Sequence, residues 1–338
     1  MTVGIAGWYR KGNFGDDLMA MMFAKELRSH GFDVLLWGIR GTEAEQWGAT
    51  STSQIEEFVS SIDVLVLGGG GLLANASVED RFDRFLSTLV REAEERSIPI
   101  HGISLGGDGT LSPKTISPGR KALLNRVGTL TVRNKRDVAD VRACGADATF
   151  AHDIVWICGQ YTDMDIQQDR QRERVLVNVE EKSTARKLYI VAVCGVQAIT
   201  TKRKFSFLNI IREENPHHRL QQLLSDSGLI SYHQITGVDD CLNRIKQSSL
   251  VISSKMHIGV VAFSLGIPFI SVFGEPKTKI MLKGIGTEYC YRNSILSVTK
   301  SLIDATRPSS LPTVKGSVLD NIKDSSKKHF RLLLKTLK

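Results

Sequence analysis

The feature that most constrains the fold is an alternation of short apolar runs with helical stretches along the chain. The run Ile62–Leu67 (IDVLVL) is almost entirely apolar, which is typical of a parallel strand covered on both faces. The stretch Asp16–His30 shows helical spacing of its apolar residues and is followed by Gly31, which stands where a helix-ending glycine belongs. Strands that alternate with helices in this way predict a doubly wound parallel sheet.

The same reasoning predicts two series of elements. In the first, strands are expected at Val3–Gly7, Phe32–Trp37, Pro99–Leu105 and Thr129–Val132, with helices at Glu79–Arg96, Gly119–Val127 and Asn134–Ala143. In the second, strands are expected at Val175–Val179, Leu188–Val193, Leu229–Tyr232, Leu250–Ser253 and Pro268–Phe273, with helices at Phe205–Asp226, Val238–Gln247 and His257–Leu265. A chain of 338 residues, at about 150 residues per domain, favours two domains.

We therefore expect an α/β protein with two doubly wound, Rossmann-like domains facing across a cleft. The expected boundaries are 1–159 for the N-terminal domain, 160–174 for a polar linker, 175–316 for the C-terminal domain and 317–338 for a basic amphipathic helix. That helix either packs back on the domains or lies on an anionic membrane surface. Ligands of such sheets lie outside the carboxyl ends of the strands, so residues just after strands are the candidates for function.

Charge and composition narrow the functional classes. The net charge of +8, from 44 Lys+Arg and 36 Asp+Glu, favours acidic partners such as phosphates, anionic sugars or a membrane surface. It is too mild and too dispersed to indicate nucleic acid. No apolar run reaches the roughly 18 residues of a membrane helix, and the N-terminus lacks the pattern of a signal peptide. Five scattered cysteines without a CxxC pair predict reduced thiols in the cytoplasm.

The loop after the first expected strand begins like a phosphate-binding loop, with Gly7 and Gly12 at G-x-x-x-x-G spacing. Asn13 and Phe14 then replace the required Lys and Ser/Thr, which argues against an NTPase. Glycines at a helix N-terminus still favour an anion or a sugar hydroxyl. The polar candidates there are Asn13, Gly15 and Asp16, and the structural alternative is helix capping by Asp16 or Asp17.

Four glycines, Gly68–Gly71, follow the expected strand Ile62–Leu67. Glycines such as Gly69 and Gly70 let a backbone approach a ligand or another strand very closely, and a tight turn is the alternative interpretation. The chain contains no G-x-G-x-x-G, so the sequence gives no support for a nicotinamide cofactor.

Gly102–Gly106 matches the nucleophile elbow G-x-S-x-G, and Asp153 and His257 follow in the hydrolase order. The elbow needs a helix directly after its serine, whereas Gly107, Gly109 and Pro113 indicate a loop. We therefore do not expect a serine hydrolase.

Arg133 ends another expected strand, where it can fork onto a carboxylate or a phosphate; a surface ion pair is the alternative. Asp153, beside His152, ends the next β-like segment and is a further candidate to face the cleft.

The richest segment is Ser253–His257, which runs from a buried strand directly into an apolar helix. Ser254, Lys255 and His257 stand at this junction, and Lys277 follows one βα unit later. Two cations and an imidazole suit an anionic substrate that needs proton transfer, although a histidine at a helix start is often structural. Without an H-E-x-x-H motif or a Cys/His cluster, no metal is implied.

Taken together, these motifs resemble those of the polysaccharide pyruvyltransferase family. The resemblance is carried by Asn13-Phe14-Gly15-Asp16, by the strand Asp63–Leu67 with its glycines, by Val132-Arg133 through Gly145, by Asp153, by Ser253–His257, by Gly266-Ile267-Pro268 and by Lys277. It covers about residues 1–155 and 235–285.

The resemblance implies a two-domain GT-B-like fold with the acceptor side in the N-terminal domain and the donor side in the C-terminal domain. It implies transfer of the enolpyruvyl group of phosphoenolpyruvate onto two hydroxyls of a glycan or lipid-linked oligosaccharide, giving a pyruvate ketal in surface polysaccharide biosynthesis. It implies no metal or redox cofactor. The expected location is the cytoplasm, with peripheral contact at the inner membrane face as an option.

The resemblance also implies roles for individual residues. Arg133 and Lys255 would hold the donor, His257 would be the general acid, and Lys277 would assist at the phosphate. Asp16 is our candidate for the group that takes the hydroxyl proton. The remaining expected substrate contacts are Asn13, Gly15, Gly69, Gly70, Asp153 and Ser254.

One departure from the family pattern is Lys255, because the family usually has Arg there and lysine cannot form a planar two-point fork. Two alternatives stay open on the same fold: a GT-B glycosyltransferase that uses a nucleotide sugar, and a catalytically silent glycan- or phosphate-binding protein.

Overall fold

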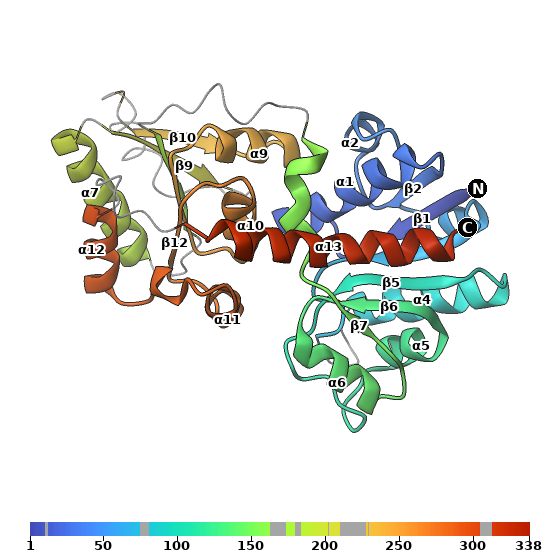
Figure 1. Ribbon diagram of the computed structural model, residues 1–338. Coiled ribbons are helices and arrows are strands. Elements are labelled where there is room, and N and C mark those ends of the chain that lie inside the picture. Colours follow the sequence, from blue (N-terminus) through green and yellow to red (C-terminus); the bar gives the residue numbers. More distant parts are fainter. Residues whose placement is uncertain are drawn as a thin grey trace. The chain divides into compact units, whose positions relative to one another are not determined.

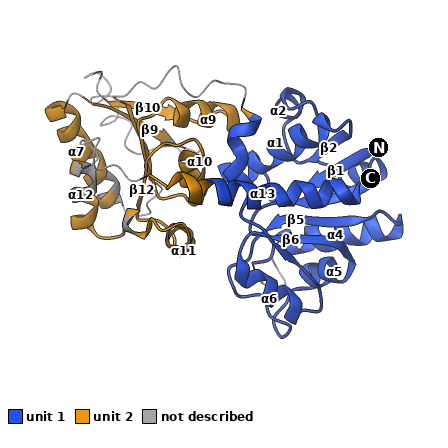
Figure 2. Cartoon of the chain, in the orientation of Figure 1, with its two compact units in different colours: residues 1–161, 320–338 blue, residues 162–319 orange. Residues whose placement is uncertain are grey.

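The computed structural model (Figure 1) describes residues 1–10, 13–74, 81–162, 174–179, 184–201, 203–209, 228, 230–304 and 313–338. The chain divides into two compact units (Figure 2). Unit 1 comprises Met1–Tyr161 and Asp320–Lys338, and unit 2 comprises Thr162–Leu319. Most of the final helix, α13 (Gly316–Thr336), therefore belongs to unit 1.

Unit 1 is built on a parallel sheet in the order β3-β2-β1-β4-β5-β6-β7. Its strands are β1 (Thr2–Ala6), β2 (Asp33–Trp37), β3 (Thr50–Thr52), β4 (Val64–Gly68), β5 (Ile100–Leu105), β6 (Val127–Val132) and β7 (Thr149–Phe150). Its helices are α1 (Phe14–Ser29), α2 (Gly41–Gln46), α3 (Ile55–Ser60), α4 (Arg81–Glu95), α5 (Pro118–Arg126), α6 (Lys135–Ala143) and the 3-10 helix η1 (Ile154–Tyr161).

The expected buried strand is confirmed as β4, all of whose residues are buried. One face of the sheet, with Leu65 and Leu105, packs against Leu86 and Leu89 of α4 in a single core cluster. Covering the sheet on both faces is what allows β4 to be continuously apolar.

Unit 2 is a second parallel sheet, in the order β10-β9-β8-β11-β12-β13. Its strands are β8 (Arg174–Asn178), β9 (Lys204–Asn209), β10 (Ile230–Gln234), β11 (Leu250–Ser253), β12 (Phe269–Val272) and β13 (Tyr291–Arg292). Its helices are α7 (Thr184–Thr201), α9 (Val238–Lys246), α10 (Met256–Ser264), α11 (Pro276–Gly284), the 3-10 helix η2 (Glu288–Cys290) and α12 (Ile295–Asp304). Helices α7 and α12 lie on one side of this sheet, and α9, α10 and α11 lie on the other (Figure 1).

Each sheet reverses its strand order once, and this places the candidate loops. In unit 1 the reversal lies between β1 and β4, and in unit 2 it lies between β8 and β11. Ligands of doubly wound sheets bind at such switch points, outside the carboxyl ends of the strands. The loops after these four strands hold most of the residues singled out from the sequence.

Two expectations in unit 2 were wrong. Leu188–Val193 is not a strand but lies within α7, because the side chains that α7 buries, Ile190, Cys194 and Ala198, recur every four residues. The expected helix Phe205–Asp226 begins instead with β9, and residues 210–227 lie outside the described ranges. Most of the expected linker, residues 163–173, also lies outside them.

Helix α13 packs its apolar side within unit 1. Ile322, Phe330 and Leu333 are buried, and the Phe330 ring meets that of Phe23 edge-on at 5.4 Å. Among the residues that the structure describes, no helix combines the length and the apolarity needed to cross a membrane.

Candidate functional site

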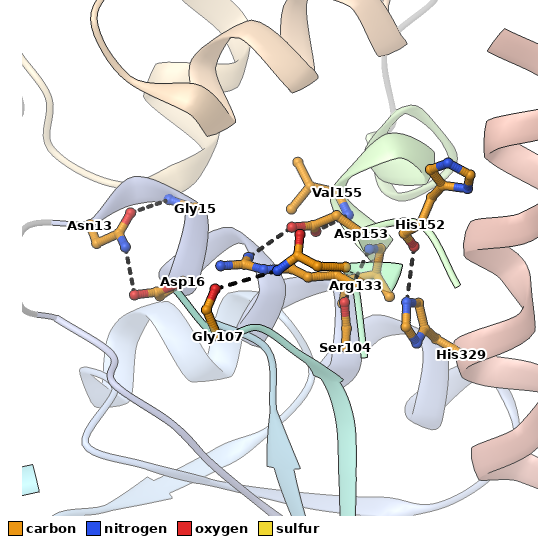
Figure 3. A network of polar contacts seen from close by, with 12 residues as sticks. Asn13, Gly15, Asp16, Ser104, Gly107, Arg133, His152, Asp153, Val155 and His329 are labelled. Carbon is orange, nitrogen blue, oxygen red and sulfur yellow. Dashed lines mark hydrogen bonds and ion pairs between the residues drawn. The ribbon is translucent and has the colours of Figure 1, made fainter. Parts of the chain in front are cut away.

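In unit 1, the polar residues after β1 form the first turn of α1 (Figure 3). Asn13 is the N-cap: its side-chain oxygen accepts a hydrogen bond from the Gly15 N–H at 3.2 Å, and its Nδ2 donates to Asp16 Oδ2 at 2.6 Å. Asp16 is buried and Asn13 is exposed. The structure thus brings Asn13, Gly15 and Asp16 together at a helix N-terminus, where the backbone favours an anionic or hydroxyl ligand.

The glycines after β4 pack against this turn. Gly69 and Gly70 have φ of +70° and +80°, a conformation that other residues rarely adopt. A side chain at Gly69 would meet Met19 Sδ, and one at Gly70 would meet Asp16 Oδ1. The Tyr9 hydroxyl donates to the Gly68 carbonyl at 2.8 Å and ties the loops after β1 and β4 together. The glycines therefore make room for α1.

Asp17, next to Asp16, has a raised pKa that the sequence alone did not indicate. Its Oδ1 accepts a hydrogen bond from the Arg10 N–H at 2.6 Å. Burial raises the pKa of the Asp17 carboxyl to about 6, with help from the negative charge of Asp16 and against the effect of that hydrogen bond. A carboxylate with such a pKa can accept a proton near neutral pH.

Arg133 and Asp153 form an almost buried ion pair, with Arg133 Nη1 donating to Asp153 Oδ2 at 2.8 Å (Figure 3). Asp153 Oδ1 accepts from the Val155 N–H at 3.0 Å. The arginine passes close over Gly106, where a side chain would meet Arg133 Nε. An arginine held by a carboxylate in this way keeps a fixed orientation.

The expectation that Ser104 is not a nucleophile agrees with its surroundings. Its side chain is fully buried, and its Oγ accepts a hydrogen bond from the Ile154 N–H at 3.3 Å. Ser104 has a φ of +57°, but no helix follows until α5 begins at Pro118, so the helix that a nucleophile elbow needs directly after its serine is missing.

In unit 2, the switch point is organised by Asn178, a residue that the sequence analysis passed over. Its Oδ1 accepts from Ser253 Oγ at 3.0 Å, and its carbonyl accepts from the Ser254 N–H at 3.0 Å. Ser253 Oγ in turn accepts from the Lys255 N–H at 2.9 Å. These contacts fix the backbone that carries Lys255 into α10. The available signal was a single polar residue ending the apolar strand β8.

Lys255 is the N-cap residue of α10, and His257 is buried in its first turn. Lys277 lies in the first turn of α11, and its Nζ forms an ion pair at 2.7 Å with Glu275, the N-cap residue of that helix. Burial acts to raise the pKa of Glu275, but the hydrogen bond and charge of Lys277, with the charges of Lys255 and His257, outweigh it and lower that pKa. The two lysines and the histidine therefore act on one carboxylate.

Two buried hydroxyl groups, one in β12 and one in α11, lie on either side of the turn between these elements. Ser271 and Thr278 are fully buried, and their hydroxyls have no hydrogen-bond partner among the described residues. A side chain at Gly274 would meet Ser271 Oγ, and the Gly274 carbonyl accepts from the Tyr291 hydroxyl at 2.6 Å. The N-termini of α10 and α11, both partly positive, carry the three cationic groups that act on the Glu275 carboxylate. Within the described ranges, no group of His, Cys, Asp and Glu could hold a metal ion.

Comparison with solved structures defines the class of the fold. UDP-GlcNAc 2-epimerase from Methanocaldococcus jannaschii aligns over 99% of both chains with a TM-score of 0.65 at 12% identity. The enzyme of the same name from Neisseria meningitidis aligns over 99% of both chains with a TM-score of 0.64 at 12% identity. A UDP-glucosyltransferase from Polygonum tinctorium covers 99% of this chain and 98% of its own, with a TM-score of 0.54 at 11% identity. The expected two-sheet α/β fold of the GT-B type is confirmed.

The sequence profile of the polysaccharide pyruvyl transferase family matches residues 13–274. The chain belongs to this family, as its motifs predicted, and is accordingly a transferase of polysaccharide biosynthesis. The match ends just before Glu275 and Lys277. No curated protein sequence matches the chain significantly.

Proposed function

We propose that the protein transfers the enolpyruvyl group of phosphoenolpyruvate to two hydroxyls of one glycan sugar, forming a pyruvate ketal. The observation that carries this proposal is the grouping of Lys255, His257 and Lys277 at two helix N-termini of unit 2, in a chain of the pyruvyl transferase family. Helix N-termini and cations suit the phosphate and carboxylate of the donor. A histidine suits proton transfer near neutral pH.

The proposed reaction begins when His257 gives a proton to the methylene carbon of phosphoenolpyruvate. The neighbouring carbon becomes electron-deficient, and the first sugar hydroxyl adds to it and loses its proton. The carbon–oxygen bond to phosphate then breaks, with both electrons leaving on the phosphate. The second hydroxyl adds to the same carbon and loses its proton, which closes the ketal. One hydroxyl proton replaces the proton given by His257, the other leaves with the departing phosphate as hydrogen phosphate, and the reaction needs no metal or redox cofactor.

The cations of unit 2 have distinct places in this proposal. Lys277 already binds the carboxylate of Glu275, so an anionic group of the donor would take the place of Glu275. Lys255 offers a compact point charge at the start of α10.

Arg133, in unit 1, stays a predicted donor ligand. Both oxygens of Asp153 accept hydrogen bonds from the protein, so we assign Asp153 to positioning Arg133 instead of to binding substrate.

The first turn of α1 is the proposed acceptor side. Asn13, Gly15 and Asp16 would meet the sugar hydroxyls of a glycan or a lipid-linked oligosaccharide. Asp16 stays our candidate for the base, and Asp17, with a pKa of about 6, is a second candidate in the same turn. Gly69 and Gly70 would act indirectly, by letting α1 approach β4.

The direct test incubates the purified protein with phosphoenolpyruvate and a panel of free and lipid-linked glycans. We expect phosphate release that depends on both substrates, together with a glycan whose mass gain corresponds to one ketal-linked pyruvate. Nucleotide release from a UDP- or GDP-sugar, without turnover of phosphoenolpyruvate, would support the glycosyltransferase alternative instead. Turnover of neither donor would favour a glycan-binding protein.

A further inference from the structure

Helix α7 is apolar on two opposite sides, although only one side faces the core of unit 2. Ile190, Cys194 and Ala198 lie on the inner side and are buried in the core cluster against the sheet. Val196 and Ile199 lie on the outer side and are exposed by 58% and 72%. A helix that is apolar all round is normally covered on every side, and among the residues that the structure describes no element covers the outer side of α7.

Helix α12 extends this outer surface. It packs beside α7 (Figure 1), and the hydroxyls of Tyr189 and Thr299 are hydrogen-bonded between the two helices. Val298 anchors α12 in the core, while Ile295, Leu296 and Ile303 are exposed by 51%, 83% and 42%. We call Val196, Ile199, Ile295, Leu296 and Ile303 the α7–α12 face. Exposed apolar residues gathered on neighbouring helices mark an interaction surface.

The charges around the α7–α12 face indicate which kind of partner it binds. Residues 184–204 contain five Lys or Arg and no Asp or Glu. Arg186 near the start of α7, Lys204 just after its end, and Lys300 of α12 are all exposed. Apolar side chains with basic residues at both ends complement an anionic lipid surface, which is apolar within and negatively charged outside. A second copy of this face would place like charges against each other in either orientation, which is unfavourable.

We propose that the α7–α12 face binds peripherally to an anionic lipid bilayer, with α7 and α12 lying in the plane of its surface. The five apolar side chains would enter the headgroup region, and the basic residues would pair with lipid phosphates. This surface differs from α13, whose apolar side is packed within unit 1. The proposal does not depend on the reaction proposed above.

The test measures co-sedimentation of the full chain with vesicles of phosphatidylcholine alone and of phosphatidylcholine with phosphatidylglycerol. We expect binding to the anionic vesicles at least about tenfold stronger than to the neutral ones, and weaker at high salt. The double variant Ile199→Asp, Leu296→Asp should lose at least about tenfold in binding. The matched control is Ile280→Asp, because Ile280 is exposed by 70% but lies on α11, on the opposite side of the sheet. It should bind as the wild type does.

Two results would overturn the proposal. One is wild-type protein that does not prefer anionic vesicles. The other is unchanged binding by the double variant, or by the milder pair Ile199→Ser, Leu296→Ser if the aspartates impair folding. Circular dichroism checks that each variant is folded. A wild-type dimer that the double variant abolishes in sedimentation equilibrium, without vesicle binding, would assign the face to a second copy instead.

Discussion

A buried histidine anchors the final helix, and acidification should weaken that anchor. His329 of α13 is fully buried, with Nε2 at 2.9 Å from the His152 carbonyl oxygen and Nδ1 at 2.7 Å from Thr131 Oγ1. The carbonyl can only accept, so Nε2 carries the proton and Nδ1 accepts from Thr131. Burial lowers the pKa of His329 from 6.5 to about 4, although the charge of Asp153 and the hydrogen bonds that the imidazole makes to the backbone of His152 and Ala151 oppose this effect.

The sign of the pH dependence follows from that depressed pKa. Below about pH 6.5 the unfolded chain binds a proton at His329, while the folded protein does not until about pH 4. The stabilisation is therefore complete above pH 6.5 and is lost as the pH falls through this window. Between pH 7.5 and 5.0 the free energy of unfolding falls by about 2 kcal/mol. About 1.5 pH units of this range lie below the pKa of the unfolded state, and each costs about 1.4 kcal/mol.

The assay is denaturant unfolding followed by tryptophan fluorescence. All four tryptophans, Trp8, Trp37, Trp47 and Trp156, lie in unit 1, so the signal reports the unit that holds His329. The stability advantage of wild type over His329→Gln should shrink by about 2 kcal/mol between pH 7.5 and 5.0. The control Phe330→Leu removes packing from the same helix without removing a titratable group, so its cost should be the same at both pH values. If the difference in unfolding free energy between wild type and His329→Gln does not change with pH either, this reasoning is refuted.

Variants at three further residues test the candidate site of unit 2 and the core of unit 1. His257→Ala should reduce turnover by about 10²–10⁴-fold with an unchanged melting curve; activity within tenfold of wild type in a phosphate-release assay would contradict its role as the acid. Lys255→Met should raise the KM for phosphoenolpyruvate by roughly 10- to 150-fold, the equivalent of losing one charge-assisted hydrogen bond, whereas Lys255→Arg should keep it or lower it. Asp83→Ala should cost about 3–5 kcal/mol in the tryptophan-detected unfolding of unit 1, because it leaves Arg120 buried without its carboxylate partner at 2.9 Å.

The sequence predicted best where chain-local patterns decide the structure. The boundaries of β11, Leu250–Ser253, were predicted to the residue, because a buried parallel strand is apolar throughout. The resemblance likewise identified the family from motifs such as Asn13–Asp16 and Ser253–His257.

Prediction from the sequence failed where tertiary packing determines the local structure or the role of a residue. The β-branched run within Leu188–Val193 favours a strand, yet it folds as α7 because one side of that helix fills the core under the sheet. Asn178 is important because it accepts a hydrogen bond from Ser253, 75 residues away. Glu275 is important because the charges of Lys277, Lys255 and His257 act on it. The local pattern marks Asn178 only as a polar residue at the end of the apolar strand β8, and it does not reveal these partners. His329, which contacts Thr131 from 198 residues away, is another example.

Proton transfer from His257 to the methylene carbon of phosphoenolpyruvate is the central step of the proposed reaction. The most direct measurement runs the reaction in D₂O with a glycan acceptor and determines the deuterium content of the ketal methyl group by mass spectrometry and NMR. We predict one deuterium in each methyl group, because the proton on the imidazole exchanges with solvent before it is transferred. A ketal methyl group without deuterium, or phosphate release without any ketal, would contradict the proposed reaction.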